Sequence, residues 1–239
     1  MSKNGMRLGA VALTTAAVLG AGGASAWAAT PAAGGQSLSA IQAKAAAAIS
    51  LRVNDLNAAV IKVNDSKDLG TDASALAAYL QADIAPLQAL GQKIAGDTSP
   101  STALADAATI FTNYRVLVLA LPAARLAGTS DGIDITTVPN LTALSAKAAS
   151  RVNPSNAATV QPLINDLNAQ ISAATANTSG VAATVLGYSP ASWNANHSLL
   201  ASPVSSVQSA KSDISKARND VKQLRSDLKP PATAPTAAS

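Results

Sequence analysis

The chain has 239 residues and a formal net charge of +4, with 48% hydrophobic but only 3% aromatic residues and no cysteine. The absence of cysteine excludes disulfides and thiolate metal sites. Much of the apolar content is alanine, the best helix former, which favours closely packed helices over a sheet. The basic residues are spread along the chain, which argues against nucleic-acid binding.

Residues 1–28 have the pattern of a cleaved secretory signal peptide. Lys3 and Arg7 precede an apolar run, and Ala24-Ser25-Ala26 and Ala26-Trp27-Ala28 both fit a cleavage site. An uncleaved membrane anchor is the alternative, which Gly20, Gly22 and Gly23 and the short apolar run oppose. Removal of this segment lowers the basic residues from 17 to 15, against 13 acidic ones.

Residues 29–37 read as a linker of small residues, residues 38–229 as one helical bundle domain, and residues 230–239 as a disordered tail. Three segments of the domain carry apolar residues at alternating steps of three and four, which predicts the narrow seam of a coiled-coil-like helix. The seam positions of the longest segment are Val160, Ile164, Leu167, Ile171, Ala174, Thr178, Val181 and Val185. The other two segments are residues 49–63 and 207–228.

The first mature helix is predicted to begin at a capping Ser37 or Ser39 and to end near residues 65–68, before Gly70. A second helix follows from Asp72, and Pro86 should kink or break it.

A third helix should begin near Ser101 or Thr102 and carry the least polar stretch of the mature chain, residues 110–121. Apolar residues on every side predict burial on every side. A buried strand over residues 116–121 is the alternative, and the stretch is too short to span a bilayer. Pro122 should kink or end this helix, and residues 128–139 read as a long surface loop.

Residues 140–152 should form a shorter helix, after which Ser155 or Asn156 caps a long one that continues to Gly187. Residues 188–203 are predicted to form a turn with a short helix. Pro203 should open the last long helix, which ends near Lys229.

Nucleophilic catalysis needs an activated nucleophile with an oriented base, usually histidine. The single histidine, His197, lies in a predicted turn, and one histidine cannot build a zinc site. Asp131 and Asp134 lack the spacing of a calcium loop. We therefore expect a protein that is not an enzyme and that carries no metal or cofactor.

Arg115 is the one candidate binding residue, together with its neighbour Tyr114, because a charge within the most apolar helix must be paired or reach water. Asp83, Asp106 or a chain-end carbonyl could pair with it in a structural clasp. Alternatively, Arg115 could bind the anionic head of a lipid or a polyanion between helices.

Three segments together resemble a group of uncharacterised, secreted, alanine-rich helical proteins of actinobacteria: YRVLVLALPAARL (residues 114–126), GYSPASWNANHSLL (residues 187–200) and SAKSDISKARNDVKQLRSDL (residues 209–228). The resemblance covers most of the mature chain. It implies secretion and an all-helical fold, and it implies no active site.

The sequence thus predicts an all-α, elongated antiparallel bundle of about five main helices with coiled-coil-like packing. Its expected function is that of a secreted, non-enzymatic structural or interaction protein of the cell envelope or exterior. Its expected partners are itself, another envelope protein, or cell-wall polymer or lipid; nucleic acid and a membrane span in the mature chain are not expected. The alternative function is a carrier of a lipid-like apolar ligand held between helices.

Overall fold

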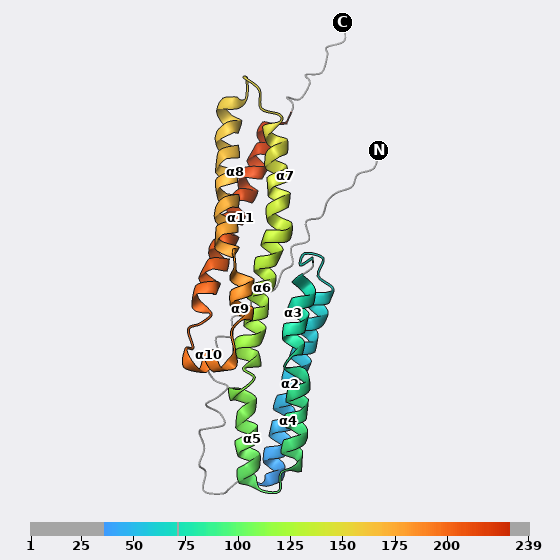
Figure 1. The fold of residues 1–239 in the computed structure, drawn as a ribbon. Coiled ribbons are helices and arrows are strands. Elements are labelled where there is room, and N and C mark those ends of the chain that lie inside the picture. The colour runs from blue at the N-terminus through green and yellow to red at the C-terminus, as the bar shows by residue number, and fades with distance from the viewer. Residues whose placement is uncertain (1–35, 71, 230–239) are drawn as a thin grey trace, which may run out of the picture. The chain divides into compact units, whose positions relative to one another are not determined.

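The computed structural model describes residues 36–70 and 72–229, which form helices joined by short turns, with no strand in these ranges (Figure 1). This confirms the predicted all-α class and the helical bundle. The predicted signal peptide, most of the linker and the C-terminal tail lie outside the described residues.

The first helices begin and end where the sequence signals predict. Helix α2 (Leu38–Asn64) is capped by Ser37, whose hydroxyl accepts a hydrogen bond from the Ala40 N–H, and Gly70 adopts φ +51° in the turn that follows. The predicted second helix is broken into α3 (Asp72–Gln81) and α4 (Ile84–Gly96), because Pro86 has no N–H to donate to the preceding turn.

The next stretch holds α5 (Pro100–Thr112), a break at residues 113–115, and then an unbroken helical run over residues 116–149. This run comprises a π-helical turn η1 (Val116–Ala120), α6 (Leu121–Gly132), a second π-helical turn η2 (Ile133–Thr137) and α7 (Val138–Ala149). The strand alternative for residues 116–121 is therefore wrong. The loop predicted for residues 128–139 is also wrong, because this segment is helical throughout.

Two proline residues fit into the long helical run because each follows a π-helical turn. The Leu121 N–H donates to the Val116 carbonyl one residue before Pro122, and the Val138 N–H donates to the Ile133 carbonyl one residue before Pro139. These wider turns make room for the proline rings and omit the hydrogen bond that proline cannot donate. Gly128 allows α6 to approach α3 closely, since an added Cβ would lie 3.4 Å from Leu76 Cδ2.

The prediction that residues 110–121 are buried on every side of their helix is also wrong. Ile110, Val116 and Leu119 are buried, whereas Leu117 is 42% exposed and Val118 38% exposed. The break before η1 turns the following residues to a new face, so that two of the most apolar positions meet solvent.

The C-terminal part contains α8 (Ala157–Thr178), α9 (Val181–Leu186), α10 (Pro190–Ala195) and α11 (Ala201–Asp227). The helix predicted to reach Gly187 is interrupted at Gly180, where φ is +72°, and resumes as α9. The short helix within residues 188–203 is confirmed as α10, and α11 begins two residues before Pro203.

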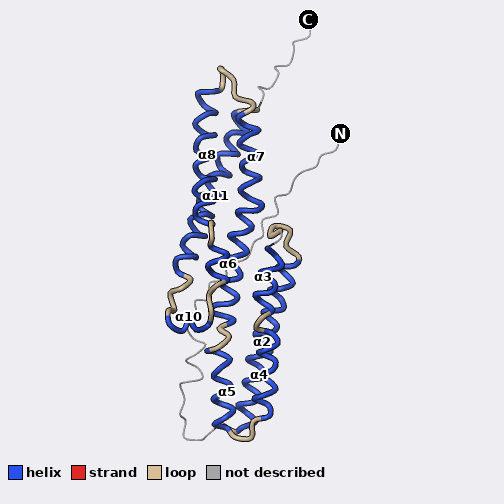
Figure 2. The backbone as a smooth tube through the Cα atoms, viewed as in Figure 1, coloured by secondary structure: helices blue, strands red, loops and turns tan. Residues whose placement is uncertain are grey.

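The helices pack in two groups that share the long run of residues 116–149. In one group α2 contacts α3, α4 and α5, and in the other α8 lies along α11 with α7 beside both (Figure 2). Gln42 of α2 donates to the Ile94, Ala95 and Asp97 carbonyls, each at 3.1 Å, and so satisfies the end of α4.

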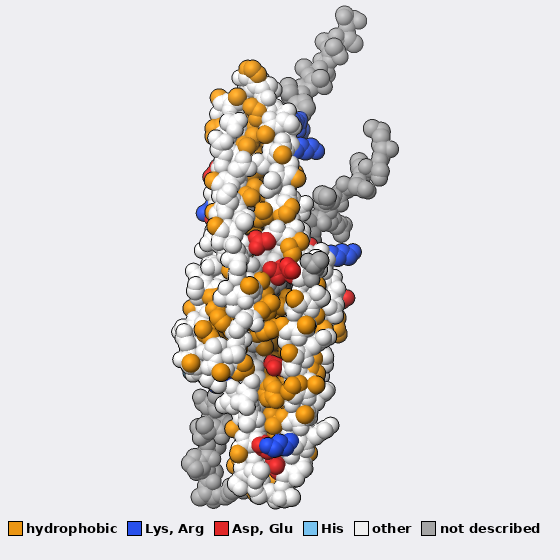
Figure 3. Space-filling view, in the orientation of Figure 1, with side chains coloured by type: hydrophobic (Ala, Val, Ile, Leu, Met, Phe, Trp, Pro, Cys, Tyr) orange, Lys and Arg blue, Asp and Glu red, His pale blue; other side chains and the backbone are white. Residues whose placement is uncertain are grey.

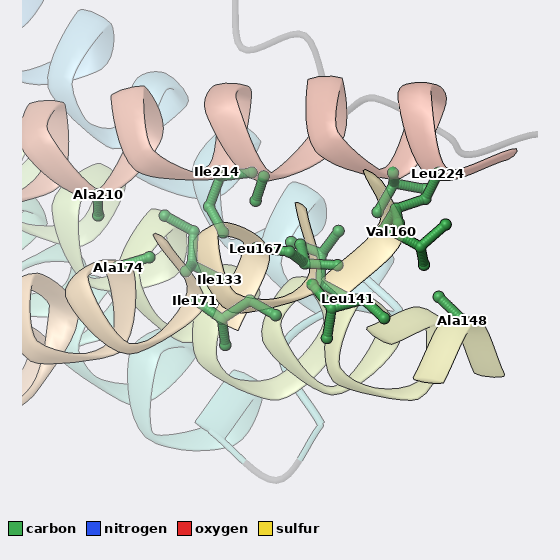
Figure 4. Close-up of a cluster of buried hydrophobic side chains, with 13 residues drawn as sticks. Ile133, Leu141, Ala148, Val160, Leu167, Ile171, Ala174, Ala210, Ile214 and Leu224 are labelled. Carbon is green, nitrogen blue, oxygen red and sulfur yellow. The ribbon is translucent and has the colours of Figure 1, made fainter. Parts of the chain in front are cut away.

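Every predicted seam position between residues 160 and 185 is buried, as are most of those in the other two segments. In the second group the seam side chains of residues 160–174 and 210–224 point into one cluster between three helices (Figure 4). The cluster includes Leu141 of α7, Leu167 and Ile171 of α8, and Ile214 and Leu224 of α11. The seam signal in the sequence therefore identifies the core.

Candidate functional site

Arg115 lies in the break between α5 and η1 with a left-handed backbone, φ +47°, and its side chain is half-buried. Its Nε donates to Asn194 Oδ1 of α10 at 2.7 Å, and Asn194 Nδ2 donates to the Thr112 carbonyl at 3.0 Å. The pair joins α10 to the exposed end of α5. This is the geometry of a clasp, but its partner is an amide rather than Asp83 or Asp106.

Tyr114 faces a different neighbour from Arg115. Burial raises the pKa of the Tyr114 hydroxyl, and the nearby Asp83 carboxylate raises it further. The same two causes raise the pKa of Tyr79 to about 12, and burial also raises the pKa of Asp83. Tyr114 and Tyr79 therefore both lie near Asp83, whereas Arg115 forms its hydrogen bond with Asn194.

The buried arginine of the first group is Arg52, which the sequence reasoning missed. Its side chain is 7% exposed, its Nη1 donates to the Ala48 carbonyl at 2.8 Å, and its guanidinium lies 4.6 Å from the centre of the Phe111 ring. Burial lowers the pKa of Arg52, and the nearby Asp55 carboxylate acts in the opposite direction. Because position 52 lies beside the seam residues Ile49, Val53 and Leu56, the heptad register could have indicated its burial.

A polar cluster surrounds η2, where the second group meets α6. The Ser130 hydroxyl donates to the Thr178 carbonyl at 3.0 Å, and the buried Thr178 hydroxyl donates to the Asp134 carboxylate. Asp131 lies near both Asp72 and Asp134. Burial, Asp72 and Asp134, in decreasing order, raise the pKa of Asp131 to about 6.

We expect Asp131→Asn to stabilise the protein at neutral pH. Because the folded pKa lies above the unfolded value of about 3.9, the folded state binds more protons between about pH 4 and pH 6. The free energy of unfolding therefore falls as pH rises through this window. Allowing for solvent screening of this half-buried group, removing the charge should add about 1 kcal/mol at pH 7.5 and little near pH 4.

Urea denaturation at pH 7.5 and pH 4 measures this change in the free energy of unfolding. The matched control is Asp227→Asn, because Asp227 is an exposed carboxylate on α11. An Asp131→Asn protein with the same pH dependence as the wild type would contradict the assignment of this carboxylate.

His197 lies in the turn between α10 and α11. Its ring is exposed and packs edge to face on Trp193, with centroids 5.8 Å apart. Within residues 36–70 and 72–229, no group of three or more histidine and aspartate side chains is arranged to hold a metal ion.

Two shallow depressions lie between helices, away from residues 110–121. One, of about 210 Å³, lies between α7 and α11, where Leu144, Val221 and Leu224 are flanked by the cations Lys147, Arg151 and Arg225. The other, of about 410 Å³, lies between α2 and α4. It is lined by small and amide residues, among them Gly91 and Asn54, and by the aliphatic Ile49 and Val53.

The outer faces of the three longest helices differ in chemistry. Helix α2 exposes what we name the α2 seam, Ala47, Leu51, Asn54, Ala58 and Ile61. Helix α11 exposes what we name the α11 row, Lys211, Arg218, Lys222 and Arg225. The exposed face of α8 carries small and polar residues, such as Ala158, Asn165, Ala169 and Ser172. Charge is thus sparse over much of the surface, as the face in Figure 3 shows.

Residues Pro100–Ala149 form the one stretch among the described residues that is long and apolar enough to cross a membrane, with a mean hydropathy of 1.3 in its most apolar window. Length and composition alone are weak support for a span, since the core helix of a soluble protein meets the same criteria. This stretch is interrupted at residues 113–115 and packs against α2, α3, α8, α9 and α11.

No protein-family model, curated protein or solved structure matches this chain.

Proposed function

We propose that this protein is a secreted, non-enzymatic interaction protein of the cell envelope or exterior, which works through the exposed faces of its helices. The α11 row is the observation that supports this proposal most strongly. The pattern of a signal peptide in residues 1–28 supports the extracytoplasmic location.

The α11 row concentrates positive charge on one side of a chain whose overall charge is small. Its residues follow steps of seven, four and three, which keeps them on one face of the helix. All four are exposed, and none forms a salt bridge within the described part of the chain. Lys216 on the same helix is different, because it pairs with Asp213 at 3.2 Å. A linear array of unpaired cations suits an anionic polymer, so we assign cell-wall polymer as the ligand of this face.

Replacing the four cations of the α11 row by glutamine should weaken binding to isolated cell walls by about 10-fold, since screened surface contacts each contribute about 0.2 to 1 kcal/mol. Cosedimentation of the purified protein with cell walls of the producing organism, at low and high salt, measures this loss. The wild-type binding should fall with salt, and the binding of the variant should depend less on salt.

A matched control removes four exposed cations from other helices and turns, with Lys62, Lys67, Arg125 and Lys147 all changed to glutamine. It has the same net charge as the α11-row variant. Equal binding by these two variants would show that net charge, and not the α11 row, carries the interaction. An absence of wall binding by the wild type would overturn the assigned ligand.

A carrier of an apolar, anionic ligand is the second candidate function. It is favoured by the depression between α7 and α11, whose apolar floor and three flanking cations suit an acyl chain with an acidic head. Its volume of about 210 Å³ is below the usual 300 to 1,000 Å³ of ligand pockets, so it would hold only part of a lipid. Arg151 is already engaged there, since its Nη2 donates to the Leu228 carbonyl at 2.9 Å. Lipid extraction of the purified protein tests this function.

A further inference from the structure

The outer face of α2 carries a second heptad pattern that the fold leaves unpartnered. The buried residues Ile41, Ala45, Ile49, Leu56 and Val60 form one stripe of α2. The α2 seam lies about half a turn round the helix from that stripe, and its positions again alternate steps of four and three. Two of its residues are the most exposed large hydrophobic side chains among those described, Leu51 at 53% and Ile61 at 60%.

We infer that the α2 seam binds the same seam of a second copy of this chain, with the two helices antiparallel. This inference rests on the proposed function, because it names one partner for a protein that works through exposed helical faces.

The order of side chains along the seam supports an antiparallel pair about a two-fold axis. Asn54 lies at the centre and would face Asn54 of the other copy. On either side, the large Leu51 would face the small Ala58, and the large Ile61 would face the small Ala47. Each large side chain thus meets a small one, which a parallel pair would not provide. A central asparagine pair fixes register in coiled coils, because any shift leaves both amides without partners.

The charges at the two ends of the seam are also complementary. The alternating steps continue to Lys44 before Ala47 and to Asp65 after Ile61, and both residues are exposed. Neither forms a salt bridge within the described part of the chain. In the antiparallel pair each Lys44 would face Asp65 of the other copy, whereas a parallel pair would place like charges together. The interface is therefore isologous, with the same patch used by both copies.

The surroundings of the seam admit a second helix. The depression between α2 and α4 runs along one edge of the seam. Its small residues Ala46, Ser50 and Gly91 leave space for the side chains of a second helix. Gln88 and Gln92 border it and offer amide groups to the backbone or side chains of the other copy. The corresponding face of α8 has neither leucine nor isoleucine, so the apolar seam is a particular property of α2.

Sedimentation equilibrium of the purified protein tests this inference. A contact of two helices of this length is small, so we expect a dimer with a Kd on the order of 1 to 100 μM. Leu51→Asp should raise this Kd by at least about 100-fold, because each dimer loses two buried leucines and gains two buried charges. Ala169→Asp, on the exposed face of α8, is the matched control and should leave the Kd unchanged.

Charge exchange tests the antiparallel geometry independently of folding. Lys44→Asp and Asp65→Lys should each raise the Kd by about 3- to 10-fold, since each creates two like-charge contacts. The double variant Lys44→Asp/Asp65→Lys should return to the wild-type value. In a parallel dimer the single changes would leave the Kd unchanged. An unchanged Kd in both single variants would therefore overturn the antiparallel arrangement.

Cross-linking adds a direct readout, since the chain has no cysteine of its own. Asn54→Cys should form a disulfide-linked dimer on mild oxidation, whereas Leu51→Cys should not, because position 51 faces position 58. Cross-linking of both variants would overturn the antiparallel register.

A wild-type protein that stays monomeric across the micromolar range would overturn the inference altogether. Cell-wall binding of that monomer would leave the proposed function intact. Conversely, a dimer found only inside the cell would overturn the proposed function and leave the α2 pairing intact.

Discussion

Leu167→Ala is expected to lower the free energy of unfolding by about 3 to 5 kcal/mol. The Leu167 side chain is fully buried on α8 and belongs to the cluster that joins α7, α8 and α11. Isoleucine, leucine and valine side chains close-packed on three helices surround it, and the alanines among them, such as Ala174 and Ala217, are too short to fill the space left behind. The cost is therefore that of the lost transfer energy plus a cavity that does not collapse.

Urea denaturation followed by far-UV circular dichroism measures this loss. Leu104→Ala is the matched control, since Leu104 lies on α5 with 39% of its surface exposed, and the change should cost no more than about 0.5 kcal/mol. If Leu167→Ala cost as little as the control, the helices of the second group would not fold as one cooperative unit.

Thr178→Val is expected to destabilise the protein by about 1.5 to 3 kcal/mol, although it makes the seam uniformly apolar. The Thr178 side chain is 1% exposed, and its hydroxyl donates to the Asp134 carboxylate and contacts the Ala174 carbonyl at 3.0 Å. Valine has the same shape but no donor. The Asp134 carboxylate would then lose the hydrogen bond from Thr178 at a half-buried position, and this loss costs more free energy than the added apolar surface contributes.

A double-mutant cycle of Thr178→Val with Asp134→Asn isolates this pair. Thr178→Ser, which keeps the hydroxyl and loses one methyl group, should cost about 1 kcal/mol. A Thr178→Val protein as stable as the wild type would show that water satisfies Asp134 as well as threonine does.

The heptad seams could be predicted from the sequence because burial of one helix face leaves a direct periodic signal. The seam of residues 160–185 gave the core of α8 and α9, including the position of Thr178. It did not reveal the interruption at Gly180, since a left-handed residue between two helices hardly disturbs the spacing of the apolar positions. The caps at Ser37 and the break before Pro86 were likewise predictable from local chemistry.

The segment of residues 128–139 shows why the rest was not predictable. Its two glycines and its proline have the composition of a loop, and local preference alone favours one. The glycine at 128 instead serves close packing on α3, and a π-helical turn accommodates Pro139. The first reason is tertiary and appears only when α3 is in place, and the second is a local backbone form that the composition does not signal.

The candidate residues show the same limit. Arg115 stood out in the sequence because its neighbours are apolar, but the backbone break beside it brings it to Asn194, which is distant in the chain. Arg52 did not stand out, although it is the more deeply buried of the two. The α2 seam could be recognised only from the structure, because the sequence does not show which face of α2 the other helices leave exposed.

Native mass spectrometry of the protein purified from the culture fluid of its own host is the most direct test of a secreted interaction protein. The proposed function predicts a chain that begins after Ala26 or Ala28 and carries no small molecule. The inferred α2 pairing predicts in addition that this chain is partly dimeric at micromolar concentration. A full-length chain retained in the cells would contradict secretion. A lipid bound in stoichiometric amount would contradict the interaction function and favour the carrier function, with the depression between α7 and α11 as its candidate site.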